Sequence, residues 1–258
     1  GDHIAMERRV SICRITADGE VHITSSTQAP FIVKSLLGIF FEIDPGKIIV
    51  DTPLVGGGFG GKAGLQLEGL AYVLSRSVGG RAVMVENSRE DDMVTSPGHM
   101  GLEATVSLAA DEAGKFLGLK AEYNYNSGAY ADYAVNISRA GAIAGTGPYR
   151  IDHVHIDSRS VYTNLPFATA FRGFGHIEMM FAMERAIAEL AKKMKLDPYE
   201  IRYQNAIQPG DTPPVQSYLG RSTGNLRGCL DKVKDALGDI EPVEAVHGRL
   251  RAQSIVSF

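Results

Sequence analysis

One loop constrains this chain more than any other stretch: residues 56–62, Gly-Gly-Gly-Phe-Gly-Gly-Lys (the glycine loop). Five glycines in six residues are costly in backbone entropy, so the loop suits a place where backbone N–H groups approach a flat or charged ligand. It lies between the apolar run 47–50 and a helical pattern at 65–78, a strand-to-helix junction that favours anions. A second loop, 171–175 (Phe-Arg-Gly-Phe-Gly), also precedes a helical pattern and repeats the Phe-Gly pair.

The bulk composition excludes several classes of protein. The net charge is -4 with no basic block, which argues against a nucleic-acid partner. The two cysteines, Cys13 and Cys229, are far apart in the sequence. We therefore expect no iron–sulfur cluster, no zinc site and no other metal ion that is ligated by protein side chains. There is no signal-peptide pattern and no apolar run long enough to span a bilayer, so we expect a cytoplasmic protein without a membrane span.

Hydrophobic periodicity predicts an α+β fold with mixed sheets and packed helices, because strands and helices alternate irregularly. A hairpin is expected at 8–16 and 21–24. The expected helices are 31–43, 65–78, 88–92, 176–194, one from 198, and 226–237, and the further strands are 81–86, 99–109, 117–125 and 153–162. The stretch 126–149, rich in Gly and Ala, is expected to be a long functional connection.

The helix at 65–78 is expected to bury a wide apolar face, formed by Leu65, Leu67, Leu70, Val73, Leu74 and Val78. The chain is interpreted as one domain over 1–258, with a division into subdomains at about 1–98 and 99–258 left open.

Two nucleotide motifs also match the glycine loop. The P-loop pattern fits from Gly56 to Lys62, but the next residue is Ala63, which has no hydroxyl for magnesium. The dinucleotide pattern fits Gly56, Gly58 and Gly61, with Glu86 as the ribose-binding acid. Residues 51–53 (Asp-Thr-Pro), however, separate strand from loop, where that motif requires a direct turn. A nucleotide-binding module of the P-loop or Rossmann type therefore remains an alternative, and a scaffold subunit with vestigial loops is a third.

The two loops taken together resemble those of the molybdenum hydroxylases, the family of xanthine dehydrogenase, aldehyde oxidase and their bacterial relatives. The glycine loop is followed about a hundred residues later by 170–175 (Ala-Phe-Arg-Gly-Phe-Gly), as in that family. Residues 25–28 (Ser-Ser-Thr-Gln) precede the first loop, and Thr163-Asn164 precedes the second. The resemblance covers the chain from about Val21 to Leu237 and implies the first molybdenum cofactor-binding domain of the xanthine dehydrogenase type.

The resemblance implies a molybdenum ion held by the dithiolene of a pterin, so that the protein supplies hydrogen bonds, orientation and electrostatics. Gln28 would donate to an oxo ligand of the metal, and Arg139 would face the substrate; these two are the implied catalytic residues. The implied cofactor-binding residues are Gln28, Gly58, Phe59, Gly60, Arg172, Gly173 and Phe174. Phe59 or Phe174 would also contact a flat substrate ring.

Departures from the family pattern narrow the substrate. Ala63 stands where xanthine dehydrogenases carry a purine-contacting glutamate, which argues against xanthine. The second loop lacks the cysteine of the copper-containing carbon monoxide dehydrogenases. After Gly175 the chain continues His176-Ile177, where the family usually has Pro-Gln. The expected substrate is thus a small aromatic N-heterocycle or an aldehyde, hydroxylated with water-derived oxygen.

The family's general base is a glutamate in a Gly-Glu motif of a second molybdenum domain, and this chain has no counterpart. Glu68, Glu86 and Glu184 lie in helix or strand patterns and are interpreted as structural. We therefore expect a second molybdenum-binding domain or subunit as partner, 2Fe-2S and FAD groups on partner chains or domains, and inactivity of this chain alone. The form of the pterin, including a cytosine dinucleotide, stays open.

Overall fold

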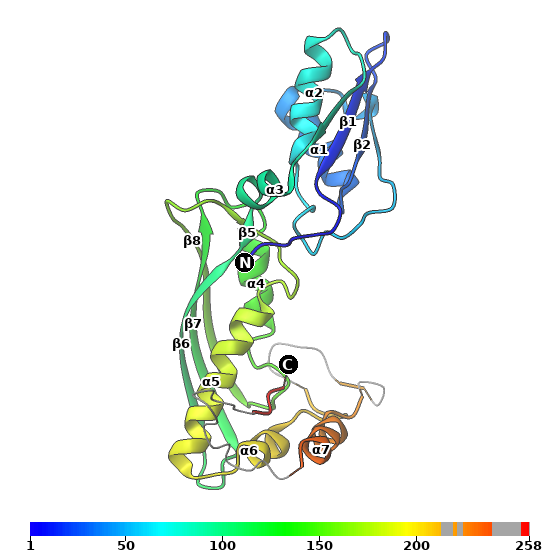
Figure 1. Cartoon of the computed structure of the whole chain (residues 1–258). Coiled ribbons are helices and arrows are strands. Elements are labelled where there is room, and N and C mark those ends of the chain that lie inside the picture. The colour runs from blue at the N-terminus through cyan, green and yellow to red at the C-terminus, as the bar shows by residue number, and fades with distance from the viewer. Residues whose placement is uncertain (213–218, 221–223, 239–253, 258) are drawn as a thin grey trace, which may run out of the picture. The chain divides into compact units, whose positions relative to one another are not determined.

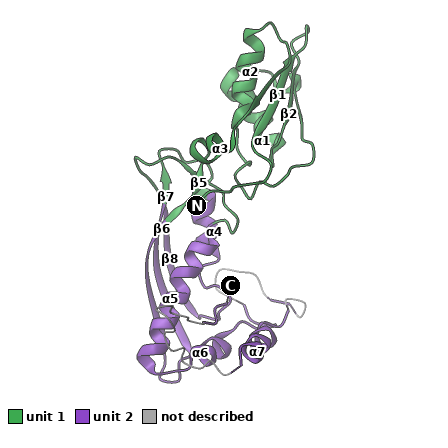
Figure 2. Cartoon of the chain, viewed as in Figure 1, with its two compact units in different colours: residues 1–101, 126–135, 160–174 green, residues 102–125, 136–159, 175–258 purple. Residues whose placement is uncertain are grey.

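A computed structural model describes residues 1–212, 219–220, 224–238 and 254–257 of the chain (Figure 1). The chain forms two compact units that interleave along the sequence (Figure 2). The first comprises 1–101, 126–135 and 160–174, and the second comprises 102–125, 136–159 and 175–258. Mixed sheets and packed helices confirm the predicted α+β class. The division into subdomains at about residue 98 stays a prediction.

The first unit contains a four-stranded mixed sheet in the order β3-β2-β1-β4. Its strands are β1 (Val10–Ile15), β2 (Val21–Ser25), β3 (Ile48–Asp51) and β4 (Val83–Glu86). The predicted hairpin is confirmed, because β1 pairs antiparallel with β2. β1 also pairs antiparallel with β4, whereas β2 and β3 run parallel.

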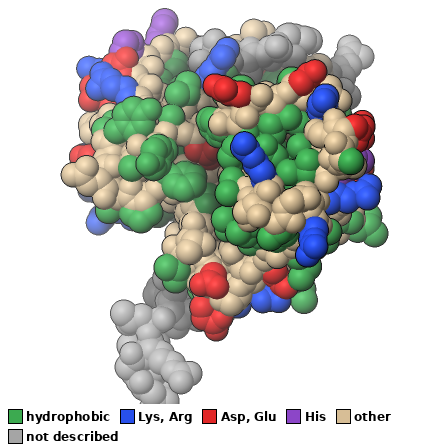
Figure 3. Space-filling model, turned by 90° about the horizontal axis from the view of Figure 1, so that it is seen from above, with side chains coloured by type: hydrophobic (Ala, Val, Ile, Leu, Met, Phe, Trp, Pro, Cys, Tyr) green, Lys and Arg blue, Asp and Glu red, His purple; other side chains and the backbone are tan. Residues whose placement is uncertain are grey.

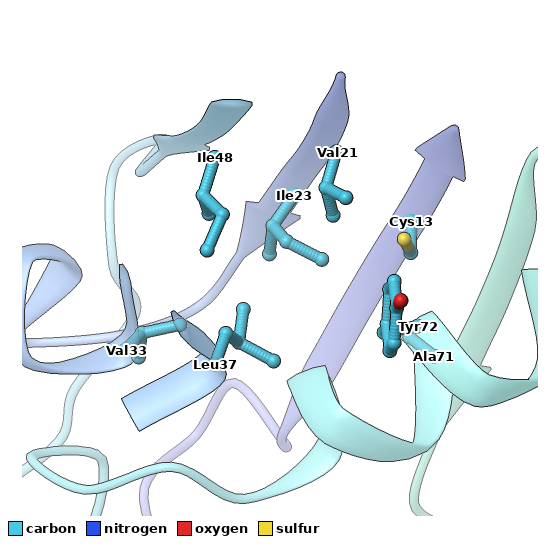
Figure 4. Packing of buried hydrophobic residues seen from close by; sticks show 8 residues of the cluster. All are labelled: Cys13, Val21, Ile23, Val33, Leu37, Ile48, Ala71 and Tyr72. Carbon is cyan, nitrogen blue, oxygen red and sulfur yellow. The ribbon is translucent and has the colours of Figure 1, made fainter. Parts of the chain in front are cut away.

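Helix α1 (Pro30–Phe41) connects the parallel strands β2 and β3, and a short 3₁₀ turn, η1 (Pro45–Lys47), follows it. Pro30 occupies the first helical turn. Proline suits this position because backbone N–H groups there have no partner within the helix and proline has no N–H. The core of this unit lies between the sheet and α1 and α2 (Figure 4). It consists of Cys13, Val21, Ile23, Val33, Leu37, Ile48, Ala71 and Tyr72.

Helix α2 (Leu67–Ser77) confirms the predicted helix but not its predicted buried face. Its buried residues are Glu68, Ala71, Tyr72 and Ser75, while Leu70, Val73, Leu74 and Val78 are exposed. The polar members of the buried face are satisfied, since Ser25 Oγ donates to Glu68 and Ser75 Oγ donates to the carbonyl of Arg81. Satisfied hydrogen bonds make polar burial tolerable, which apolar periodicity alone does not reveal.

A short helix and a strand pair complete the first unit. Helix α3 (Arg89–Thr95) confirms the helix expected from residue 88, and the side chains of its cap, Ser88, and of Asp91 form a reciprocal capping box. The chain then enters β5 (Gly98–His99), which pairs parallel with β9 (Ala168–Thr169). This pair ties the stretch just before the second loop to the N-terminal part of the chain.

Most of the three-stranded sheet β6-β7-β8 belongs to the second unit; its strands are β6 (Gly101–Ala110), β7 (Phe116–Gly128) and β8 (His153–Tyr162). Helix α5 (His176–Met194) lies along one face of this sheet, as Figure 1 shows. Five apolar side chains of α5 are buried: Met179, Met180, Met183, Ile187 and Ala191. Ile177 and Phe181, two other apolar residues of α5, are exposed.

Helices α6 (Pro198–Asn205) and α7 (Leu226–Leu237) confirm the last two predicted helices. Arg202 on α6 is almost fully buried and is neutralised by Glu184 on α5, at 2.6 Å. The long connection predicted at 126–149 is only partly a loop, since it contains helix α4 (Ala134–Ile143). Its alanines favour a helix over a loop, a preference that the glycines around them mask.

Many apolar side chains remain at the surface of the described residues. Figure 3 shows hydrophobic side chains gathered in patches on the face seen from above. On α1, Phe31, Ile39 and Phe40 are each more than half exposed. No helix in the described part of the chain is both long and apolar enough to cross a membrane.

Candidate cofactor site formed by two Phe-Gly loops

The glycine loop and the start of the second loop touch in the first unit. Gly60 lies against Ala170, the residue just before the second loop. A Cβ atom on Gly60 would lie 2.3 Å from the carbonyl oxygen of Ala170, so no other residue fits there without displacing one loop. The structure thus brings together two segments that the sequence separates by more than a hundred residues.

The two loops share an unusual backbone geometry. Phe59 has φ of 53° and Phe174 has φ of 50°, so both aromatic residues adopt the left-handed conformation that non-glycine residues rarely take. The glycines beside them, Gly60 and Gly173, have φ of 98° and 103°. Backbone strain of this kind gathers at ligand-binding sites, where the surrounding structure enforces it.

Gln28 lies directly on the glycine loop. Its Oε1 accepts hydrogen bonds from the backbone N–H of Gly60 at 2.9 Å and of Lys62 at 3.3 Å. A Cβ on Gly58 would lie 2.3 Å from the same oxygen, so this glycine makes room for the amide. These two hydrogen bonds fix the carbonyl end of the amide. The NH₂ end of this exposed side chain is directed away from both N–H groups and can act as a neutral donor.

Lys62 is buried and fully engaged within the protein. Its Nζ donates to Glu7 Oε2 and to the Glu7 carbonyl, each at 2.9 Å, and to Ser26 Oγ at 2.6 Å. An ammonium group has three N–H donors, and all three are used. Lys62 is therefore unavailable to a nucleotide phosphate, and α2 begins only at Leu67; the P-loop interpretation of this loop is wrong.

The dinucleotide interpretation also fails on geometry. Four residues separate the end of β3 from the glycine loop, and β4 lies beside β1 rather than beside β3. Glu86, the predicted ribose-binding acid, forms an ion pair with Arg8. The strands on either side of the glycine loop and α2, β3 and β4, are therefore not neighbours in the sheet, whereas that motif places them side by side.

The N-terminal segment is a part of this site that sequence reasoning missed. Glu7 Oε2 accepts from the N–H of Gly56 at 2.7 Å, and buried Arg9 donates to the carbonyl of Gly61 at 2.6 Å and to Asp92 at 2.8 Å. His3 Nε2 lies 2.7 Å from the carbonyl of Ala170. These contacts join residues up to 167 positions apart in the sequence. The only sequence feature that indicates them is the polar character of residues 2–9.

Tyr133 contacts both the second loop and Ala63, the residue that directly follows the glycine loop. Its hydroxyl donates to the carbonyl of Ala63 at 3.1 Å, and its ring meets Phe174 edge-on at 6.1 Å. Beside it, Thr169 Oγ1 donates to Asp132, whose backbone is left-handed with φ of 39°. Burial raises the pKa of Tyr133, with a smaller contribution from the charge of Asp132, so the phenol stays protonated as a donor.

The predicted arginines are found at two different places. Arg172 is exposed in the second loop, within the first unit. Arg139 is exposed on α4 and belongs to the second unit, so its approach to the loops stays a prediction. Within the first unit, the structure therefore brings together Gln28, the glycine loop and the second loop.

The three glutamates interpreted as structural each have a protein partner. Glu68 accepts from Ser25 Oγ at 2.7 Å, Glu86 pairs with Arg8, and Glu184 pairs with Arg202. Among the described residues, no group of three or more His, Cys, Asp or Glu side chains could hold a metal ion. A metal at these loops would therefore depend on a cofactor for its ligands.

Comparisons with known proteins agree with this geometry. A family model described as "Molybdopterin cofactor-binding domain" matches residues 1–206. The chain is 33% identical, over 230 residues, to a putative xanthine dehydrogenase molybdenum-binding subunit of Escherichia coli (strain K12), covering 89% of this chain and 30% of that protein. It is 29% identical to the aldehyde oxidoreductase of Megalodesulfovibrio gigas, covering 83% of this chain and 23% of that one.

Solved structures give the same answer. The aldehyde oxidoreductase from Desulfovibrio gigas superposes with a TM-score of 0.84 at 26% identity, over 91% of this chain and 26% of that chain. Quinoline 2-oxidoreductase from Pseudomonas putida 86 gives a TM-score of 0.80 at 26% identity, over 92% and 31%. The chain thus spans about a third or less of these relatives. It belongs to the molybdopterin cofactor-binding domain family of the xanthine dehydrogenases and aldehyde oxidoreductases.

Proposed function

We propose that this chain forms one wall of the pterin–molybdenum site of an oxidoreductase that hydroxylates an N-heterocycle or an aldehyde with water-derived oxygen. The observation that carries this proposal is the contact of the two Phe-Gly loops, with the Gln28 amide fixed at their edge by Gly60 and Lys62. Relatives named for xanthine, nicotinate and aldehyde chemistry support the reaction class. The donors present fit a cofactor that brings its own metal ligands.

The cofactor, when bound, supplies the oxidising centre and the oxygen donor, and the chain supplies shape and hydrogen bonds. Gln28 would donate its free amide N–H to an oxygen ligand without adding charge. Gly58 and Gly60 would let the backbone approach from one side, and Arg172 and Gly173 from the other. Phe59 and Phe174 would border the reacting position, where an aromatic edge can orient a flat ring.

Arg139 would act on the substrate rather than on the cofactor. A guanidinium beside a heterocycle stabilises negative charge that develops in the transition state, or binds a carboxylate in two-point fashion. The small side chain of Ala63 offers no carboxylate to a purine, which favours a less polar heterocycle or an aldehyde over xanthine.

The remaining parts of the enzyme are also proposals. The general base would be a glutamate of a second molybdenum-binding domain or subunit, and electrons would leave through 2Fe-2S and FAD groups carried by partner chains or domains. The cytosine dinucleotide form of the pterin and a cytoplasmic location remain predictions. Without the second domain, the chain should bind no substrate productively.

Molybdenum and pterin analysis of the protein purified with its natural partners tests the proposal. We expect about one molybdenum and one pterin per chain in the active complex. An active, complete complex that contains no molybdenum would refute the assignment.

The residue roles need a second experiment on the same complex. Gln28→Ala should lower kcat roughly tenfold or more on every substrate, because it removes a hydrogen bond to the cofactor. Arg139→Ala should lower kcat/KM by an amount that depends on the substrate. Arg76→Ala, an exposed arginine on α2, is the control and should match wild type. Wild-type turnover in both test variants would show that the assigned roles are wrong.

A further inference from the structure

The N-terminal segment, residues 3–9, contacts both Phe-Gly loops within the first unit. Glu7 and Arg9 bind the glycine loop, through the N–H of Gly56 and the carbonyl of Gly61. His3 is the member of this segment that reaches both loops. The position of the segment is therefore tied to the position of the site.

His3 occupies the space between the two loops. A Cβ on Gly61 would lie 2.6 Å from Cγ of the His3 ring, so the glycine loop makes room for the imidazole. On the other side, Nε2 lies 2.7 Å from the carbonyl oxygen of Ala170, and the ring packs on Phe171 with centroids 4.8 Å apart. His99 packs on the same phenylalanine at 4.4 Å.

The protonation state of His3 suits a bridging donor. A carbonyl oxygen only accepts, so Nε2 carries the proton. Burial lowers the pKa of His3, the hydrogen bond to Ala170 opposes this effect, and nearby Arg9 and His99 lower it while Asp2 raises it. The net direction is downward, so the ring is neutral at neutral pH.

The backbone beside His3 is strained. Ile4 has φ of 43°, which is a rare conformation for a β-branched residue. Such a conformation persists only where contacts on either side hold the chain in place. Here those contacts are His3 on one side and the anchored residues Glu7 and Arg9 on the other.

We propose that His3 is a positioning residue, whose imidazole holds the glycine loop and the second loop at a fixed separation through Gly61, Ala170 and Phe171. The pterin cofactor would then bind between walls that this chain's own N-terminal segment keeps in register. The role of this separation in pterin binding rests on the proposed function, whereas the coupling between the two loops does not.

Amide hydrogen exchange tests the coupling without reference to cofactor. In the full chain with its partners, His3→Ala should raise exchange about tenfold in peptides covering both 56–64 and 168–175, because each loop loses a packed neighbour. His3→Gln keeps an N–H donor near the same place and should restore most of the protection at 168–175. His22→Ala, whose ring on β2 contacts Glu20, is the matched control and should leave both peptides unchanged.

Pterin retention is the second readout. Wild type should lose pterin faster as the pH falls below 6.5. The reason is that His3 takes up a proton more readily when the two loops separate than when they pack around its ring. In His3→Gln this part of the pH profile should be absent. Exchange in His3→Ala that changes only within residues 1–9 would overturn the positioning role. A wild-type complex without pterin would instead refute the proposed function and leave the exchange result to decide the coupling.

Discussion

The two loops that meet in the first unit are held in place by different chemistry. The glycine loop is fixed by polar and charged side chains, from Lys62, Glu7, Gln28 and Arg9. The second loop is held mainly by rings, with Phe171 packed on histidines and Phe174 on Tyr133. A lost charge partner leaves a buried group unpaired, whereas a trimmed ring only reduces contact. The glycine loop should therefore be the more sensitive of the two to single substitutions.

The largest effect is expected from Lys62→Met. The change removes the buried cation that Glu7 and Ser26 share, so the free energy of unfolding should fall by about 3 kcal/mol. Urea denaturation measures it. Lys47→Met, which loses only an exposed contact to the Asp18 carbonyl, should change stability by less than about 0.5 kcal/mol. Equal effects of the two substitutions would contradict the role given to the buried pair.

Gly60→Ala should come next, because it attacks the contact between the loops directly. The new Cβ meets the Ala170 carbonyl in a backbone with φ of 98°, and strain plus overpacking should cost about 2 kcal/mol. Gly79→Ala is a matched control, with φ of 74° and open space around the site. Its cost should be only about 1 kcal/mol. If thermal melts show the same loss for both, then the loops do not press on one another at Gly60.

A smaller effect on stability is expected at Tyr133, whose ring packs on Phe174 of the second loop. Tyr133→Phe keeps the edge contact with Phe174 and loses the hydrogen bond to Ala63, at a cost of about 1 kcal/mol in unfolding free energy. Tyr133→Leu should lose about 1 kcal/mol more, because the aromatic edge is gone as well. Tyr162→Phe, at an exposed tyrosine, should be neutral in the same denaturation assay. A Phe variant as damaging as the Leu variant would mean that the ring contributes nothing.

The smallest effect is expected in the pH dependence of stability at the glycine loop, which charged side chains hold in place. Burial raises the pKa of Glu7, but hydrogen bonds from Lys62, Ser26 and Gly56 and the Lys62 charge outweigh it, so the pKa lies below its ordinary value of 4.5. The carboxylate thus stabilises the fold fully above pH 4.5, and this contribution is lost as the pH falls through the lowered pKa. Glu7→Gln should flatten the acid limb of unfolding free energy against pH. The exposed Glu90→Gln serves as control, and an unchanged acid limb in both variants would refute the linkage.

Most of the local structure could be predicted from the sequence. Ser88, Pro30 and Asp197 mark helix starts by their own chemistry, and the structure begins α3, α1 and α6 there. The alternating run after residue 8 predicts a hairpin because side chains of a strand point to opposite faces. These features depend on neighbours within a few residues, so the sequence displays them directly.

Which face of a helix is buried could not be predicted in one case. Apolar spacing placed Leu70, Val73 and Leu74 in the core, yet α2 buries Glu68 and Ser75. The polar side chains are stable there only because Ser25 and the Arg81 carbonyl complete their hydrogen bonds. Those partners come from other elements, so periodicity within α2 carries no information about them.

By itself, the sequence determined the class of site: two Phe-Gly loops, Gln28 before the first, and no ligand cluster for a metal. Only the tertiary structure decided what holds the loops, because Gly60 meets Ala170, Lys62 meets Glu7, and His3 meets both loops across long stretches of chain. The physical reason is that glycine permits a left-handed conformation without selecting it, and phenylalanine adopts one only where its surroundings enforce it. Selection comes from buried hydrogen bonds and charge pairs that form only when distant segments fold together.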